Sequence, residues 1–178
     1  LVARGTVSVG KPKEKPYLQT LELESSPREQ LRIFKELEVG WEMPFHDVSE
    51  TKEALEKSLK NCEDTLDWYS GKSPWGPAIL PPSHVARLMM VTLPFQAKGV
   101  AFYGANELRF VNGPVKVDVT YKAKSKIIAV GVTTKTEYYW FDSQLYEKAT
   151  NKLVAEMHHM TRCMKAGSPL YPEVPEGR

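Results

Sequence analysis

The residue pattern of this chain changes once, near Pro94, and the change strongly limits the possible folds. Before Pro94, residues 83–92 carry apolar side chains on nearly every side of a helix that Ser83 would cap (Val85, Ala86, Leu88, Met89, Met90 and Val91). A helix that is apolar all round is expected to be buried. After Pro94 the apolar residues recur with a period of two, which is typical of β-strands.

Four stretches after Pro94 have this strand pattern and are rich in Val, Thr, Tyr and Phe: residues 105–110, 115–123, 127–140 and 153–164. The sequence Ala-Thr-Asn-Lys at 149–152 predicts a hairpin turn between the last two. Long strands with no helix between them indicate an antiparallel sheet. The sequence therefore predicts an α+β fold, in which an antiparallel sheet wraps around one buried central helix.

Two further helices are predicted before the central one. Ser26, Pro27 and Glu29 form a capping pattern, and Gly40 follows a stripe of apolar residues, so we expect a helix between Ser26 and Gly40. A second helix is predicted over residues 49–61, with one apolar stripe and a charged opposite face.

The length of 178 residues is that of one domain. Residues 7–20 are rich in Lys and Pro, so residues 1–20 are predicted to form an extended arm. Residues 21–166 then form the single domain. The Pro-rich stretch 167–178 is predicted to be a tail on the surface.

Composition excludes several classes of function. The formal net charge of +2 is small and evenly spread, which argues against a nucleic-acid partner. No apolar run approaches the ~18 residues of a membrane helix. Cys62 and Cys163 lack the spacing of a metal site and fit a reducing compartment, which favours the cytoplasm. There is no glycine-rich phosphate loop, and we expect neither a metal nor a cofactor.

Several short segments, in this order, resemble the MaoC-like dehydratase family, whose members have the hot-dog fold. They are Leu-Glu-Val-Gly at 37–40, Glu-Asp-Thr-Leu-Asp-Trp-Tyr at 63–69, Ser-Pro-Trp-Gly at 73–76, Ala-Ile-Leu-Pro-Pro at 78–82, Asn-Glu-Leu-Arg-Phe at 106–110 and Gly-Pro-Val at 113–115. The resemblance covers roughly residues 36–165. It implies a hot-dog fold and a lyase that hydrates or dehydrates acyl thioesters of coenzyme A or carrier proteins, as in fatty acid or polyketide metabolism.

The resemblance also implies where the catalytic residues lie. The family's catalytic loop carries Asp-x-Asn-Pro-x-His, in which a carboxylate and an imidazole move the proton of water. Asp64 matches the Asp, but Tyr69 stands in place of the His. A tyrosine with a pKa near ~10 is a poor base at neutral pH. His84, the first residue inside the central helix, is the candidate replacement, although a ring at a subunit contact is an equal alternative.

The substrate-binding candidates lie around this loop. Trp68, Trp75, Tyr103 and Asn106 are aromatic or polar residues near the expected site, and Arg87 is the one charge in an apolar helix. Each has a structural alternative: Tyr69 and its neighbours could pack in the core, and Arg87 could pair with an acid or contact a thioester phosphate. His158 and His159 alternate on a strand, so only one can face inward.

Three functions remain open: a hydratase-like lyase on an acyl thioester or small hydrophobic substrate, a non-catalytic acyl-binding subunit of a hot-dog complex, and a biosynthetic enzyme or isomerase on a non-thioester substrate. A single hot-dog unit exposes a sheet edge, and exposed edges are usually paired. We therefore expect a homodimer or a higher even oligomer, or pairing with a second hot-dog subunit.

Overall fold

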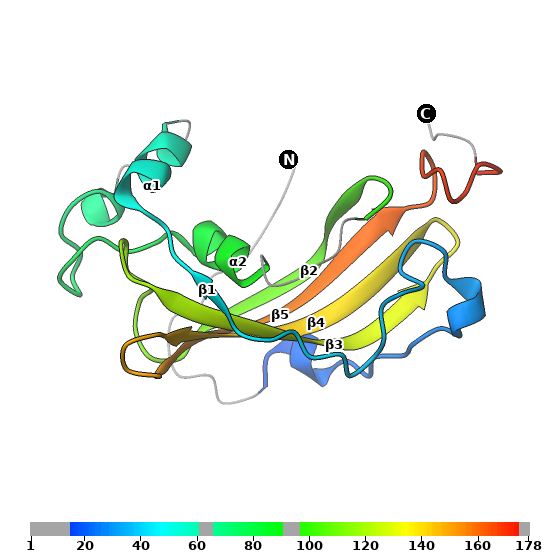
Figure 1. The fold of residues 1–178 in the computed structure, drawn as a ribbon, viewed down its shortest axis with the longest axis horizontal. Coiled ribbons are helices and arrows are strands. Elements are labelled where there is room, and N and C mark those ends of the chain that lie inside the picture. Colours follow the sequence, from blue (N-terminus) through cyan, green and yellow to red (C-terminus); the bar gives the residue numbers. More distant parts are fainter. Residues whose placement is uncertain (1–14, 61–65, 91–96, 175–178) are drawn as a thin grey trace.

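The fold is an antiparallel sheet of five strands with a helix against one face (Figure 1). The computed structural model describes residues 15–60, 66–90 and 97–174. The strands follow the order β1-β3-β4-β5-β2, with bounds β1 (His46–Val48), β2 (Ala101–Phe110), β3 (Tyr121–Val132), β4 (Thr136–Glu147) and β5 (Leu153–Met164). The helices are α1 (Lys52–Leu59) and α2 (Pro82–Met90), with short 3-10 turns η1 (Tyr17–Thr20), η2 (Arg28–Gln30) and η3 (Asp67–Tyr69). The predicted α+β architecture is confirmed.

Helix α2 packs on what we call the inner face of the sheet, and Ser143 Oγ of β4 donates to the Met89 carbonyl at 3.1 Å. The buried residues of α2 are Val85, Ala86, Leu88 and Met89. Ser83 and Arg87 are exposed, four residues apart on one side of the helix. The predicted buried central helix is confirmed, with its polar side chains on one exposed side. Its predicted end at Thr92 lies outside the described residues.

The strand predictions hold in part. The hairpin at 149–152 is confirmed, and Asn151 adopts the positive φ of 58° that such a turn requires. Residues 127–140 were predicted as one strand, but the chain turns back at 133–135. There the Thr133 N–H donates to the Thr136 carbonyl at 2.7 Å, and the Thr133 hydroxyl accepts from the Thr136 N–H at 3.1 Å. One backbone hydrogen bond and one bond to the Thr133 hydroxyl thus close a turn that contains no Gly, Asn or Pro.

The start of the second predicted strand also differs, because β3 begins at Tyr121 and not at residue 115. Residues 115–117 bond instead to the segment that leads into α2. The Leu80 N–H donates to the Val115 carbonyl at 2.7 Å, and the Val117 N–H donates to the Ala78 carbonyl at 3.0 Å. This pairing fixes the direction in which α2 starts.

The predicted helix between Ser26 and Gly40 is wrong: only the 3-10 turn η2 forms there. The Ser26 hydroxyl accepts from the Val132 N–H at 3.0 Å and does not cap a helix. The N–H groups of Arg32, Ile33 and Phe34 donate to the carboxylate of Glu137, more than 100 residues away, at 2.7–3.1 Å. Long-range partners take the donors that a helix would use. The second predicted helix is confirmed as α1.

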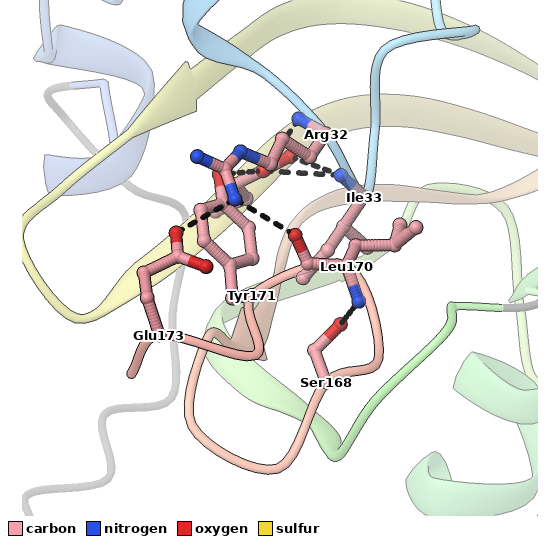
Figure 2. A network of polar contacts seen from close by, with 7 residues as sticks. Arg32, Ile33, Ser168, Leu170, Tyr171 and Glu173 are labelled. Atoms are coloured by element: carbon pink, nitrogen blue, oxygen red, sulfur yellow. Dashed lines mark hydrogen bonds and ion pairs between the residues drawn. The ribbon is translucent and has the colours of Figure 1, made fainter. Parts of the chain in front are cut away.

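Glu137 also holds the C-terminal segment. Its side chain is 0% exposed and accepts a hydrogen bond from the Tyr171 hydroxyl, in addition to the three backbone donors. We call this group the Glu137 cluster. Arg32 extends it, donating to the Leu170 carbonyl at 2.9 Å and pairing with Glu173 at 2.6 Å (Figure 2). The sequence predicted a surface tail from residue 167. Ser168 and Tyr171 are buried, so this segment packs against the domain.

The N-terminal segment covers the other face and one edge of the sheet. Leu18, Leu21 and Leu23 pack on the outer face against Ala129, Trp140 and Met160, and η1 replaces the extended arm predicted for residues 17–20. Residues 26–43 then bond along the edge of β3, for example from the Gly40 N–H to the Ile127 carbonyl at 2.8 Å. At the opposite edge, β2 has no strand on its outer side within the described part of the chain.

Candidate functional site

The N-terminal turn of α2 holds His84, whose ring is partly buried. His84 Nε2 lies 2.6 Å from Ser58 Oγ of α1, and Nδ1 lies 3.4 Å from Ser83 Oγ. The Ser58 hydroxyl donates to the Leu55 carbonyl at 2.9 Å. With the Ser58 proton on the Leu55 carbonyl, the tautomer that fits both contacts has Nε2–H donating to Ser58 Oγ and Nδ1 as the acceptor. In either tautomer the neutral His84 ring keeps one acceptor nitrogen.

An ion pair between an exposed guanidinium and a buried carboxylate lies beside this histidine. Arg87 Nη2 is 2.6 Å from Glu50 Oε2, and the Glu50 side chain is only 6% exposed. Burial lowers the pKa of His84, and the charge of Arg87 lowers it further, while Glu50 opposes them. His84 is therefore uncharged at neutral pH and able to accept a proton. The sequence predicted that Arg87 pairs with an acid, but nothing in it distinguished Glu50 from the other carboxylates.

The loop before α2 brings two of the predicted aromatic residues together. The rings of Trp68 and Trp75 meet edge to face, with centroids 5.6 Å apart. A tight turn at 73–76 places Trp75: the Ser73 hydroxyl accepts from the Trp75 N–H at 3.2 Å, and Gly76 adopts a φ of 101°. Tyr69 packs against the main core. Asp64 lies outside the described residues, so the predicted pair of Asp64 and Tyr69 has no described geometry.

Tyr103 and Asn106 lie in a different place, on the inner side of β2 beside β5. Asn106 is the register partner of His159, and the Tyr103 ring meets the His159 ring edge to face at 4.7 Å. The predicted residues therefore form two groups. His84 contacts Ser58 in the first turn of α2 and Arg87 pairs with Glu50 in the last turn, whereas Tyr103 and Asn106 lie beside His159.

His159 is the residue that the sequence reasoning left undecided. Its side chain is 0% exposed, and neither ring nitrogen has a hydrogen-bond partner among the described residues. Burial lowers its pKa from the usual 6.5 to about 4, with a smaller contribution from His158. The ring is therefore neutral, with one donor and one acceptor nitrogen. The alternation of His158 and His159 predicted that one faces inward, and the structure shows that it is His159.

His158 points to the outer face. Its Nδ1 lies 2.7 Å from Asp142 Oδ1, at the side of a surface hollow of about 540 Å³, whereas its buried Nε2 has no hydrogen-bond partner among the described residues. Other charges around this hollow also pair with one another, with Lys126–Glu42 at 3.0 Å and Arg109–Glu156 at 3.2 Å. A surface whose ionic groups already bind each other offers a ligand little new bonding, so we place the candidate site on the inner face.

Two further classes of site were tested against the described residues. Within residues 15–60, 66–90 and 97–174, no three His, Cys, Asp or Glu side chains come close enough to share a metal ion. In that same part of the chain, neither helix is long and apolar enough to cross a membrane.

Comparison of sequences finds no matching family model and no matching curated protein. Comparison of structures finds many. A MaoC-like dehydratase from Rhodospirillum rubrum superposes with a TM-score of 0.56 at 12% identity, covering 75% of this chain and 97% of that one. An (R)-hydratase from A. caviae involved in PHA biosynthesis gives 0.55 at 17% identity, covering 70% and 96%. The chain has the hot-dog fold.

A third hot-dog structure contains two proteins. It is the HadBC complex, a 3R-hydroxyacyl-ACP dehydratase from Mycobacterium tuberculosis, with a TM-score of 0.53 at 11% identity, covering 70% of this chain and 96% of the matched one. The hot-dog fold implied by the sequence resemblance is thus confirmed, and the structures that share it include hydratases and dehydratases. At these identities the likeness establishes the fold alone.

Proposed function

We propose that the protein is a cytoplasmic, hydratase- or dehydratase-like lyase that acts on an acyl thioester or a related small molecule, held on the inner face of the sheet beside α2. The observation that carries this proposal is the His84 imidazole. It is uncharged, so one of its ring nitrogens is an acceptor, and it lies partly exposed at the N-terminal end of α2. Such an imidazole is a competent general base at neutral pH.

In this proposal the residues of the catalytic loop and of α2 have defined roles. During hydration the oxygen of water bonds to C3 of the substrate while the C2=C3 double bond becomes a single bond, the water proton passes to His84, and C2 receives a proton from an acid. Asp64 and Tyr69, which precede α2 in the sequence, orient the water and supply that acid. Arg87 is half exposed although it is paired with Glu50, so it can also contact an anionic phosphate of the thioester carrier. Trp68 and Trp75 contact the acyl ligand.

Turnover of defined thioesters tests the lyase proposal. Asp64→Asn should abolish turnover of a good substrate, and His84→Ala and Tyr69→Phe should each lower kcat/KM by about 10²–10⁴-fold. His46→Ala, at an exposed histidine of β1, is the control and should leave the rate unchanged. Hydration of a simple crotonyl thioester should be slow, because Tyr69 stands where the resemblance expects an imidazole. Fast crotonyl hydration by the wild-type protein would contradict this interpretation of Tyr69.

One observation favours the alternative, an acyl-binding subunit of a larger hot-dog assembly. The edge strand β2, which has no strand on its outer side among the described residues, and its flanks expose apolar side chains (Val100, Phe102, Phe110 and Val111). A ten-residue strand with an open edge is a site for pairing with another chain. We propose that a second copy, or a second hot-dog subunit, pairs along β2. A non-catalytic subunit would bind ligand and show no turnover.

Sedimentation tests this assembly. The purified chain alone should sediment at an even multiple of its 20.2 kDa mass at micromolar concentration. Phe102→Asp, which places a charge on the β2 edge, should shift the sedimenting mass toward that of a single chain. Glu22→Asp, at an exposed residue of the N-terminal segment, should not. A wild-type mass near that of one chain would contradict self-pairing, and would leave only a different hot-dog subunit as partner.

A further inference from the structure

The feature not used by the proposed reaction is His159, in the middle of β5. Its ring lies between two aromatic neighbours: Tyr103 at 4.7 Å, edge to face, and Phe141 at 5.2 Å. Both ring nitrogens are buried and without a hydrogen-bond partner in the described part of the chain. The His159 side chain thus directs two unused polar atoms into the inner face.

Such a group is costly to keep. A buried polar atom loses its bonds to water on folding, so native proteins nearly always give it a partner. An apolar side chain of similar size at position 159 would avoid this loss. A buried imidazole with no partner is therefore a candidate for binding something that the chain itself does not supply.

The position of His159 relates it to the proposed site. Its register partner on β4 is Phe141, and Ser143, two residues further along β4, bonds to the Met89 carbonyl near the C-terminal end of α2. His84 lies at the N-terminal end of that helix, five residues away, or about 7.5 Å along the helix axis. An acyl ligand with its reacting group at His84 and its chain along α2 would therefore bring the remote end of that chain toward His159.

Access to His159 is over the inner face of β2, which pairing along the edge of that strand leaves uncovered. The Tyr103 side chain lies against the imidazole and is 60% exposed, and Asn106 beside it is also exposed. Rotation of an exposed side chain takes picoseconds to nanoseconds, so Tyr103 can move aside easily. Asn106 then adds an amide with both donor and acceptor atoms at the same place.

We propose that His159 binds an uncharged oxygen-bearing group, a hydroxyl or a ketone, on the part of the acyl ligand remote from His84. This inference rests on the proposed acyl-binding function and specifies its substrate class. A neutral imidazole offers one donor and one acceptor, which a hydroxyl can satisfy together. Burial holds the pKa of His159 near 4, so the ring carries no positive charge with which to hold a carboxylate or phosphate.

Binding of matched acyl probes tests the inference without requiring turnover. The probes are decanoyl-N-acetylcysteamine and a series of its derivatives with one hydroxyl moved along the chain from C4 to C10. The wild-type protein should bind one positional isomer about 10-fold more tightly than the unsubstituted probe, as expected for a hydrogen bond to a site built for it. His159→Phe should lose this preference and keep its affinity for the unsubstituted probe.

Two controls make the result specific. His158→Phe changes the adjacent histidine on the opposite face of the same strand and should retain the preference. His159→Leu repeats the test with a smaller side chain, in case phenylalanine does not fit. Both His159 variants should unfold at a temperature no lower than the wild type, because they remove unpaired polar atoms.

The possible outcomes separate this inference from the function on which it rests. Equal binding of all probes by the wild type would overturn the inference alone, and would indicate that a buried water satisfies the ring. Preference retained in His159→Phe or His159→Leu would overturn it as well, as would a large loss of thermal stability in both variants. Failure of every probe to bind the wild type would overturn the acyl-binding function and this inference together.

Discussion

Two buried polar side chains on the inner face of the same sheet, Glu137 and His159, have opposite surroundings. Both are 0% exposed. Glu137 accepts hydrogen bonds from three backbone N–H groups and the Tyr171 hydroxyl, whereas His159 has no partner among the described residues. The fold brings segments from both ends of the chain to satisfy the carboxylate. The contrast indicates that Glu137 serves the fold and that His159 serves a ligand.

The difference follows from where the two residues lie. Glu137 is next to the hairpin turn at the end of the sheet, where residues 32–34 and 168–173 can reach it. His159 is in the middle of β5, flanked by Phe141 of β4 and Asn106 of β2. No chain end passes there in the described residues. A polar group in the centre of a sheet must be satisfied by a neighbouring side chain, by water or by a ligand.

The largest expected effect is on Glu137. Glu137→Ala should lower the free energy of unfolding by about 3–5 kcal/mol, because it leaves buried donors at Arg32, Ile33 and Phe34 without an acceptor. Urea unfolding followed by tryptophan fluorescence measures this. Glu22→Ala, at an exposed carboxylate of the outer arm, should change stability by less than about 0.5 kcal/mol. A loss below about 1 kcal/mol for Glu137→Ala would mean that the cluster is not needed to hold the termini.

A second effect concerns acid. The unfolded chain protonates His159 near pH 6.5, but the folded chain does so only near pH 4. Between these values the unfolded state binds more protons, so stability falls as the pH falls. At about 1.4 kcal/mol per pKa unit, this site alone should remove roughly 3 kcal/mol by pH 4. His159→Phe should flatten the stability profile between pH 6.5 and pH 4, and His158→Phe should not. Parallel profiles for wild type and His159→Phe would contradict the burial of an unpaired imidazole.

The smallest effect belongs to the outer face. The Asp142 side chain, which pairs with His158, is 54% exposed. Solvent weakens such a pair, so Asp142→Asn should cost at most about 1 kcal/mol and should leave ligand binding unchanged. A loss as large as that of Glu137→Ala would show that the outer face is also a structural centre, and would weaken the contrast between the two faces.

The sequence predicted the parts of the fold that depend on local pattern. The period-2 segments, the hairpin at 149–152 and the helix near His84 were all visible, because each follows from residues close in the chain. The helix expected between Ser26 and Gly40 does not form, because Glu137 takes its N–H donors from more than 100 residues away. The turn at 133–135 was missed because the Thr133 hydroxyl replaces the usual turn residues.

The sequence named residues of the candidate site, but it did not show which of them lie together. His84 and Arg87 do lie together, and Trp68 meets Trp75. Tyr103 and Asn106 were expected in a substrate loop before the first long strand and instead lie within β2, beside His159. Neither Glu50 nor His159 could be singled out, because burial and the lack of a partner depend on the packing of distant strands. The alternation of side chains along a strand shows that only one of His158 and His159 faces inward, but it does not show which one.

Histidine ring NMR during addition of an acyl ligand tests the central claim, that the ligand lies on the inner face. The chain has four histidines: His46, His84, His158 and His159. With hydroxydecanoyl-N-acetylcysteamine of the preferred isomer, the ring nitrogen signals of His84 and His159 should shift together, at the same ligand concentration. Those of His46 and His158 should stay in place. Shifts at His158 without shifts at His84 and His159 would place the ligand on the outer face and contradict the account.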